Sequence, residues 1–228
     1  MNPLLKAVDL TKSFGTLSVV RRMSLEVRPG EIVGLAGQSG SGKSTLAMLL
    51  AGFHKPDGGE LYLDGQPLQW PFDAQALGID VIHQTPSLAE NLDITSNIFL
   101  GNEIGWPAWG KWLKIPNRQR MDREAAQILA QLDVQFDSLH QDVVNLSSEQ
   151  RQMIAIGRAM ARTPRLIVID DPTGLLSYPR QQKLLSLIQT WQLQGTAVVF
   201  SSSNLDHLLA ITDRIIVLRH GRQVAEYR

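Results

Sequence analysis

The chain has 228 residues, with 22 basic and 22 acidic side chains and no cysteine. This balanced charge gives no basic surface of the kind that nucleic-acid binding requires, and the lack of cysteine excludes disulfides and thiolate metal sites. No apolar stretch approaches the ~18–20 residues of a membrane span, and the first six residues lack the apolar core of a signal peptide. We therefore expect one α/β domain in the cytoplasm.

The first part of the chain predicts short strands. Residues 6–10 and 23–27 largely alternate apolar and polar side chains, as half-buried strands do. Phe14 follows the first of these segments, and its position alone leaves a core role and an exposed role equally open. The apolar run Ile32–Ala36 predicts a further strand, which leads directly into a glycine-rich stretch.

This glycine-rich stretch has the spacing of a phosphate-binding P-loop. It reads Gly37, Gln38, Ser39, Gly40, Ser41, Gly42, Lys43, Ser44 and Thr45, and an apolar helix follows. Glycines let the backbone N–H groups turn toward phosphate oxygens, and the helix directs the positive end of its dipole to the same place. Lys43 would reach the β- and γ-phosphates, and the Ser44 hydroxyl would hold Mg²⁺. A loop that only turns the chain is the alternative, but the flanking strand and helix favour nucleotide binding.

Strand signals continue to about residue 84 and then give way to helical ones. Short strands are predicted at residues 60–64 and 79–82, and helices at residues 94–100 and 120–132. Between these two helices three tryptophans occur within seven residues, interrupted by proline and glycine, which excludes a long helix: Trp106, Trp109 and Trp112. Local packing and an apolar docking surface both remain open for this segment.

The last third of the chain resumes alternating helices and strands. Ser147 and Gln150 form a capping box that predicts the start of a helix running to Ala161. The apolar residues 166–169 suit a strand buried on both faces of a parallel sheet, and they end in Asp170 and Asp171. Because a carboxylate beside a P-loop is where Mg²⁺ is held, we assign Asp170 to the metal rather than to a solvated strand end. A helix at 181–194, a strand at 196–200, a helix at 205–211 and a strand at 214–218 follow.

These motifs, in this order, resemble the ATP-binding subunit of an ABC transporter over nearly the whole chain. The P-loop matches Walker A, residues 166–171 match Walker B, and the LSGGQ signature is matched by Leu146, Ser147, Ser148, Glu149 and Gln150. Phe14 matches the aromatic residue that stacks on adenine, and Gln84 matches the Q-loop glutamine, which contacts Mg²⁺ or water. The residues around Gln84 and residues 91–101 are most similar to importers of monosaccharides and related small polar solutes.

The resemblance implies an α/β fold: a P-loop NTPase (RecA-like) core with an antiparallel β-subdomain and an inserted α-helical subdomain. We place the β-subdomain and core at about residues 1–84 and 164–228, and the helical subdomain at about 85–163. The implied cofactors are ATP and Mg²⁺. The implied partners are the membrane subunits, an extracytoplasmic solute receptor, and a second nucleotide-binding subunit whose signature helix covers the bound ATP. The chain would lie on the inner face of the cell membrane.

Four positions depart from the pattern of the family. Asp171 stands where a glutamate orients the attacking water, and Ser203 stands where a histidine contacts the γ-phosphate. Residues 174–177 replace a D-loop that usually ends in aspartate, and two signature glycines are replaced by Ser148 and Glu149. A carboxylate some 6 Å from the γ-phosphate would repel it by ~3 kcal/mol per unit charge at an effective dielectric constant of ~20, unless it turned away into solvent.

These departures predict a chain that binds MgATP but hydrolyses it slowly. The Asp171 carboxylate is one methylene shorter than that of glutamate, and a displacement of about 1 Å at a reacting group can cost ~10²-fold in rate. His207 would face elsewhere by a helical turn and is not expected to replace the missing histidine. The chain could serve as the weaker half of a heterodimer, or as an ATP-binding regulatory module. A soluble ABC-type ATPase of DNA repair or translation is disfavoured by the single domain and the absence of cysteine.

Overall fold

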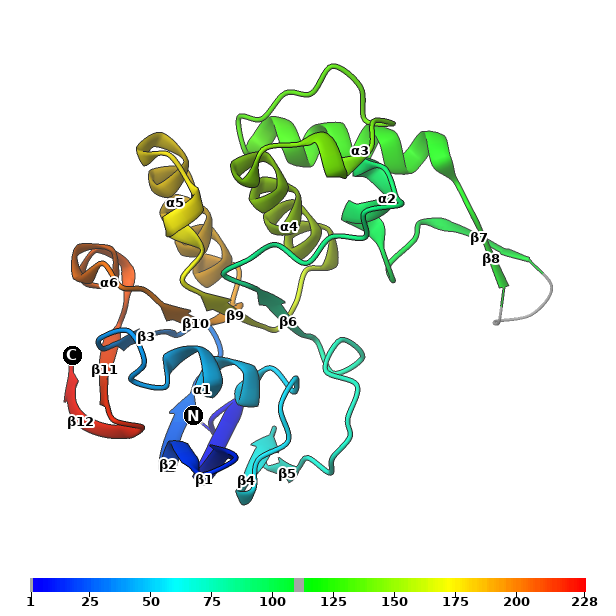
Figure 1. Cartoon of the computed structure of the whole chain (residues 1–228). Helices are drawn as coiled ribbons and strands as arrows, with labels where there is room; N and C mark the ends of the chain where they lie inside the picture. The colour runs from blue at the N-terminus through cyan, green and yellow to red at the C-terminus, as the bar shows by residue number, and fades with distance from the viewer. Residues whose placement is uncertain (1, 109–112) are drawn as a thin grey trace. The chain divides into compact units, whose positions relative to one another are not determined.

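The computed structural model describes residues 2–108 and 113–228, which form two compact units (Figure 1). The first unit comprises Met1–Gln84, Pro164–Gly174 and Gln181–Arg228. The second unit comprises Thr85–Thr163 and Leu175–Arg180. Within the described ranges, no helix is long and apolar enough to cross a membrane.

The first unit contains an antiparallel sheet with the strand order β2-β1-β4-β5. Its strands are β1 (Leu5–Phe14), β2 (Leu17–Val27), β4 (Gly58–Leu63) and β5 (Gln66–Pro67). The sequence predicted only the inner parts of β1 and β2, whereas their pairing extends as far as Phe14 and Leu17. Three irregularities in the register of this pair interrupt the alternation of side chains, so the outer parts carry no clear strand pattern.

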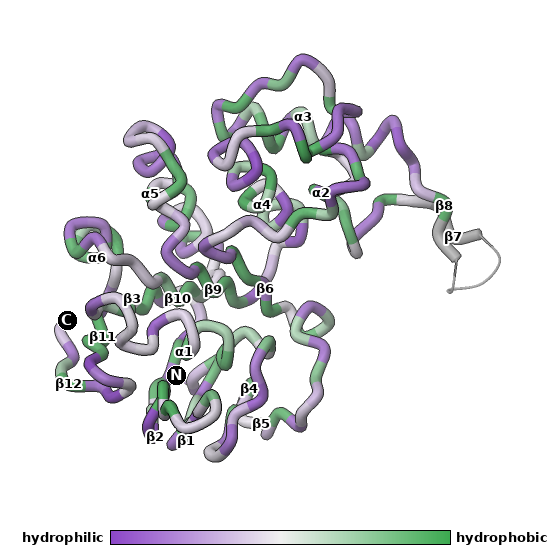
Figure 2. The backbone as a smooth tube through the Cα atoms, in the orientation of Figure 1, coloured by the Kyte–Doolittle hydropathy of each residue, from purple (hydrophilic) through white to green (hydrophobic). Residues whose placement is uncertain are grey.

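A second sheet in the same unit has the order β12-β11-β3-β10-β9-β6. Its strands are β3 (Ile32–Ala36), β6 (Ile79–Ile82), β9 (Leu166–Asp170), β10 (Ala197–Ser201), β11 (Arg214–Arg219) and β12 (Arg222–Tyr227). All neighbours in this sheet are parallel except β11 and β12. Every residue of β3, β9 and β10 is buried, and Figure 2 shows the hydrophobic colour along β9 and β10. Burial on both faces explains why these strands read as uninterrupted apolar runs.

Helices pack on both faces of this parallel sheet. Helix α1 (Lys43–Leu50) contacts β9 and β10, and it also contacts β2 of the antiparallel sheet. Helix α6 (Leu205–Ile211) contacts β3, where a Cβ atom on Gly34 would come within 3.0 Å of the Thr212 side chain. Glycine at this position therefore permits the close approach of helix and strand. The short 3₁₀ helix η2 (Pro172–Leu175) follows β9, and α5 (Tyr178–Leu193) follows it.

The second unit is mainly helical. Helices α2 (Ile94–Phe99), α3 (Arg118–Gln131) and α4 (Ser148–Arg162) contact one another in pairs, and η1 (Val143–Asn145) precedes α4. The buried side chains of Ile98, Leu129 and Ile156 belong to its core. The helices lie where the apolar spacing predicted them, to within two residues at each end.

A two-stranded hairpin in this unit was not predicted from the sequence. It consists of β7 (Gly105–Ala108) and β8 (Leu113–Pro116). Prolines in both strands obscure the strand pattern, because proline is rare within sheets. Trp109 and Trp112 lie outside the described residues, so the docking role considered for the tryptophan segment stays a prediction.

Candidate nucleotide-binding site

The parallel sheet aligns the segments that the sequence singled out. Pairing of β10 with its two neighbours sets Leu35, Ser201 and Asp170 level across three adjacent strands. Because the carboxyl ends of parallel strands meet at one edge, the P-loop, Asp171 and Ser203 all leave the sheet at this edge. Strand β6 is the next neighbour of β9, and Gln84 follows it, exposed to solvent.

Glycine is required at two positions of the loop. Gly37 has a φ of 148°, and a Cβ atom there would lie 2.4 Å from the Leu218 carbonyl oxygen. Gly42 has a φ of 105°, and a Cβ atom there would lie 2.8 Å from the Val19 carbonyl oxygen. Both contacts are with backbone that cannot easily move aside, so a side chain at either position would displace the loop from β11 or β2.

The start of α1 is open to an anion. Gly42 is its N-cap, no side chain caps it, and its first turn contains no acidic residue. Its first N–H groups therefore keep their positive potential for a ligand. Lys43 is almost buried, and its Nζ atom donates to the carbonyl oxygens of Gly37 at 2.7 Å and Gln38 at 3.1 Å. The ammonium group thus lies within the loop, while the Ser44 side chain is exposed.

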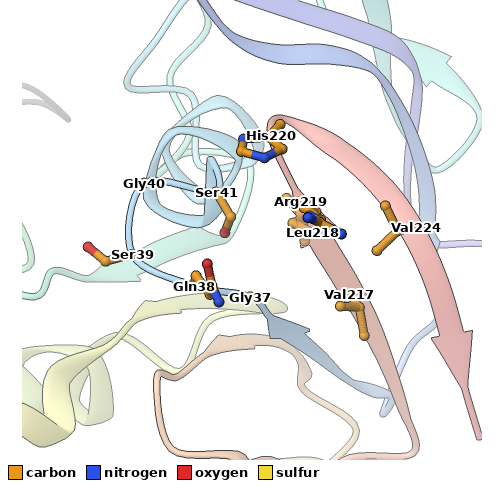
Figure 3. A pocket seen from close by; sticks show the side chains of 10 residues that line it. All are labelled: Gly37, Gln38, Ser39, Gly40, Ser41, Val217, Leu218, Arg219, His220 and Val224. Carbon is orange, nitrogen blue, oxygen red and sulfur yellow. The ribbon is translucent and has the colours of Figure 1, made fainter.

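A pocket of about 420 Å³ lies between this loop and the β11–β12 hairpin (Figure 3). The loop contributes Gly37 to Ser41, and the hairpin contributes Val217, Leu218, Arg219, His220 and Val224. The hairpin is also tied directly to the loop, because the Gly221 N–H donates to the Ser41 carbonyl oxygen at 2.9 Å. Nothing in the sequence had indicated that this hairpin would border the P-loop.

Two carboxylates end β9 in different environments. Asp170 is 5% exposed, and its Oδ1 accepts a hydrogen bond of 2.9 Å from the Ser201 hydroxyl. Asp171 has a φ of 37°, in the left-handed region, and its carboxylate accepts hydrogen bonds from the Thr173 hydroxyl at 3.3 Å and the Ser203 N–H at 3.1 Å. Ser203 therefore contacts Asp171 through its backbone and not through its side chain.

Ser201 is a site residue that sequence reasoning missed. Its hydroxyl holds Asp170, and its carbonyl oxygen accepts from the Asp171 N–H at 3.1 Å. A polar residue at the end of the strand beside Walker B was the available signal, but the strand order was needed to use it.

The residues present fit a magnesium ion bound together with a nucleotide. In the described part of the chain, no group of three or more His, Cys, Asp or Glu side chains could hold a metal ion by itself. Mg²⁺ does not need such a group, since it usually binds one or two carboxylates together with substrate phosphates and water. The almost buried Asp170 carboxylate and the exposed Ser44 hydroxyl are suitable donors.

Phe14 is not a core residue. It ends β1, its side chain is 47% exposed, and its ring meets His54 edge-on with centroids 5.6 Å apart. The Lys12 Nζ atom lies 5.6 Å from the Phe14 centroid. An exposed aromatic ring held by neighbours suits stacking on a nucleobase. His207, in contrast, is 6% exposed and has its Nε2 atom 3.2 Å from Asn204 Nδ2, which argues against a role in place of the missing histidine.

The signature residues lie at the start of α4 in the second unit. The predicted capping box is confirmed, because Gln150 N–H donates to Ser147 Oγ at 3.2 Å and Ser147 N–H donates to Gln150 Oε1 at 3.0 Å. The sequence had left open that the Glu149 carboxylate turns away into solvent, but the carboxylate is bound within the chain instead. Its Oε1 atom accepts hydrogen bonds from the hydroxyl and the N–H of Ser177, at 2.6 Å and 3.2 Å.

Comparison with known proteins identifies this arrangement. A family model described as "ABC transporter" matches residues 20–174. The chain belongs to the ABC transporter family. The sequence resemblance to this family is thereby confirmed.

Several curated ABC proteins resemble the cassette along nearly its whole length. It is 37% identical to the ribose import ATP-binding protein RbsA 2 of Burkholderia ambifaria, covering 99% of this chain and 44% of that protein. It is 34% identical to the fructose import ATP-binding protein FrcA of Rhizobium meliloti, covering 97% of this chain and 87% of that protein. The cassette thus spans less than half the length of RbsA 2 and most of the length of FrcA.

Solved structures show the same fold. The ATP-binding cassette MJ0796, in a dimeric post-hydrolysis state bound to ADP and Pi, matches with a TM-score of 0.86 and 25% identity over 98% of both chains. A nucleotide-free ATP-binding cassette from an ABC transporter matches with a TM-score of 0.81 and 25% identity, covering 100% of this chain and 92% of that chain. The α/β P-loop fold expected from the sequence is confirmed.

Proposed function

We propose that this cassette binds MgATP and is the energy-coupling subunit of a sugar importer. The proposal rests on the start of α1. The helix has no side-chain cap there, and the Lys43 ammonium lies within the same loop. The sugar assignment is supported by curated relatives at 34–37% identity, which are named for the import of ribose, fructose and xylose or arabinose.

Each site residue receives a role that its environment supports. The P-loop N–H groups and Lys43 bind the phosphates, and the exposed ring of Phe14 stacks on adenine. Ser44, Asp170 and Gln84 hold the magnesium ion or its water ligands. When bound, the metal would neutralise charge on the phosphate oxygens. Ser201 fixes the carboxylate of Asp170 through the hydrogen bond between their side chains.

The cassette works with other subunits in this proposal. A second nucleotide-binding subunit places its signature helix over the bound ATP, because one P-loop leaves the γ-phosphate partly exposed. Closure of the two drives membrane subunits between access states, and an extracytoplasmic receptor delivers the solute. A dimeric structure of the similar cassette MJ0796, at a TM-score of 0.83 and 24% identity, shows that this fold can form dimers. The location on the inner face of the membrane follows from these partners.

We further propose that hydrolysis is slow. The Asp171 carboxylate accepts hydrogen bonds from Thr173 and from the backbone of Ser203, so both of its oxygens have partners within the chain. These bonds fix the direction of the carboxylate, and the side chain is one methylene shorter than that of glutamate, so it is poorly placed to orient the attacking water. Ser203 has no imidazole that could contact the γ-phosphate.

Restoring the residues of the family pattern tests this proposal. We expect D171E and S203H together to raise steady-state phosphate release at least about tenfold over wild type, with MgATP affinity nearly unchanged. T190S, on the exposed side of α5, is the matched control and should have no effect. Phosphate release that stays at the wild-type level in the double variant, assayed with membrane subunits present, would contradict the proposal that Asp171 and Ser203 slow hydrolysis.

A further inference from the structure

Glu149 carries a negative charge at the helix start that the proposed function places over ATP. It lies in the first turn of α4. Ser147 and Gln150 already supply the reciprocal cap of this helix, so the Glu149 carboxylate is not needed for capping. In the family pattern a glycine stands at this position, so the charge requires an explanation of its own.

In the described part of the chain, the contacts of this carboxylate go to one short segment of the same unit. Glu149 Oε1 accepts from Ser177 Oγ at 2.6 Å and from the Ser177 N–H at 3.2 Å, and it lies 3.9 Å from Arg180 Nε. The Arg180 side chain in turn donates to the Leu132 carbonyl oxygen at the end of α3. Ser177 therefore provides two donors to a single oxygen, and Arg180 adds a positive charge beside it.

We propose that Ser177 is a positioning residue that holds the Glu149 carboxylate away from the MgATP of a second copy of this chain. The inference rests on the proposed function, in which α4 of one copy covers the nucleotide of the other. An unheld carboxylate at this helix start would reduce the positive potential that the helix offers to the γ-phosphate, and it would repel the phosphate itself. With its charge directed at Ser177 and Arg180, the start of α4 can approach the phosphate.

This role predicts a specific pattern of loss and rescue. Removing the Ser177 hydroxyl deletes the shorter of the two hydrogen bonds that hold the carboxylate, so S177A should weaken nucleotide-dependent association. Adding E149Q to S177A should restore association, because a neutral amide at position 149 is not repelled by the phosphate. A serine that only stabilises the segment would not be rescued by a change in the charge of Glu149.

The first measurement tests the link in the full chain without nucleotide. Hydrogen exchange of the peptide covering residues 174–180 should accelerate about tenfold in S177A and in E149Q, because each loses a charge-assisted hydrogen bond. The double variant should exchange no faster than the faster single variant. S186A is the matched control, since this exposed serine donates only to the Gln182 carbonyl oxygen of its own helix.

The second measurement is self-association in sedimentation velocity, with the non-hydrolysable probe Mg-AMPPNP. We expect S177A to need about tenfold more probe than wild type for half-maximal association, and S177A with E149Q to return to within about twofold of wild type. Unchanged association in S177A, or no rescue by E149Q, overturns the inference. Failure of wild type to bind the probe contradicts the proposed function instead, and the exchange measurement still decides the link.

Discussion

Two helix starts in this cassette differ in how the partial positive charge of their N–H groups is compensated. Helix α1 begins after Gly42 with no side-chain cap and no acid in its first turn. Helix α4 begins with a complete capping box and has Glu149 in its first turn. Every helix start leaves four N–H groups without partners and carries a partial positive charge. At α1 these groups are left for a ligand, whereas at α4 the chain satisfies some of them itself.

The difference between the two helix starts corresponds to two steps of the proposed function: nucleotide binding at α1, and closure of α4 over the nucleotide of a second copy. The α1 start has no side-chain cap that a phosphate group would have to displace, which is typical of a helix start that binds phosphate. In our proposal, the α4 start approaches the phosphate bound to a second copy while Glu149 remains bound to Ser177. The departures from the family pattern at Asp171, Ser203 and Glu149 thus lie outside the nucleotide loop, and in our proposal they affect the steps that follow binding.

The largest effect is expected at the α1 start. K43A should weaken MgATP binding at least about 100-fold, because it removes the buried ammonium that lies within the loop. Isothermal titration calorimetry measures this loss, and K55A is the matched control, since Lys55 is an exposed lysine outside the loop. Equal affinity in K43A and wild type would remove the basis for assigning this loop to nucleotide.

A pair of serine variants should separate the two helix starts. S147A removes the α4 cap and should lower the free energy of unfolding by about 1 kcal/mol, with MgATP affinity of the single chain unchanged. S44A removes no cap, so it should leave stability unchanged and reduce the Mg²⁺-dependent part of ATP affinity about tenfold. Urea unfolding and calorimetry with and without Mg²⁺ measure both quantities. Should S44A prove the more destabilising variant, the contrast between the helices would be wrong.

The smallest effect concerns a third helix start, which is capped by a charge. Burial opposes ionisation of Asp93, but hydrogen bonds from Ser96 and Arg118 outweigh it and hold the pKa of Asp93 below 3.8. Ionised Asp93 therefore stabilises the folded state at pH values above its pKa in the unfolded chain. This contribution is lost as the pH falls through the pKa of Asp93 in the folded state. D93N keeps an oxygen at the cap of α2 but removes the charge.

We therefore expect D93N to be less stable than wild type by up to about 1 kcal/mol at pH 7. The difference should shrink as pH falls below 3.8, because wild type then loses the charge as well. Urea unfolding at several pH values measures this trend, and D137N, at an exposed aspartate, is the control. A stability difference that grows with acidity would assign the effect to packing instead.

Much of the fold could be predicted because its signals are local. The buried strands β3 and β9 are apolar runs, and the cap of α4 is spelled out by Ser147 and Gln150. The β7–β8 hairpin and the outer ends of β1 and β2 were missed, since prolines and register irregularities hide the alternation that marks a strand. Tertiary pairing stabilises these segments where local pattern does not.

The P-loop could be predicted without a structure, because glycine spacing and a following lysine are properties of consecutive residues. The sequence also revealed the departures at Asp171, Ser203 and Glu149. The hydrogen-bond partners of these side chains became known from the folded structure. Asp171 accepts from Thr173 and from the Ser203 backbone, and Glu149 accepts from Ser177. These partners lie up to 32 positions apart in the chain. A side chain can accept a hydrogen bond from such a distant donor only after folding has brought the two together.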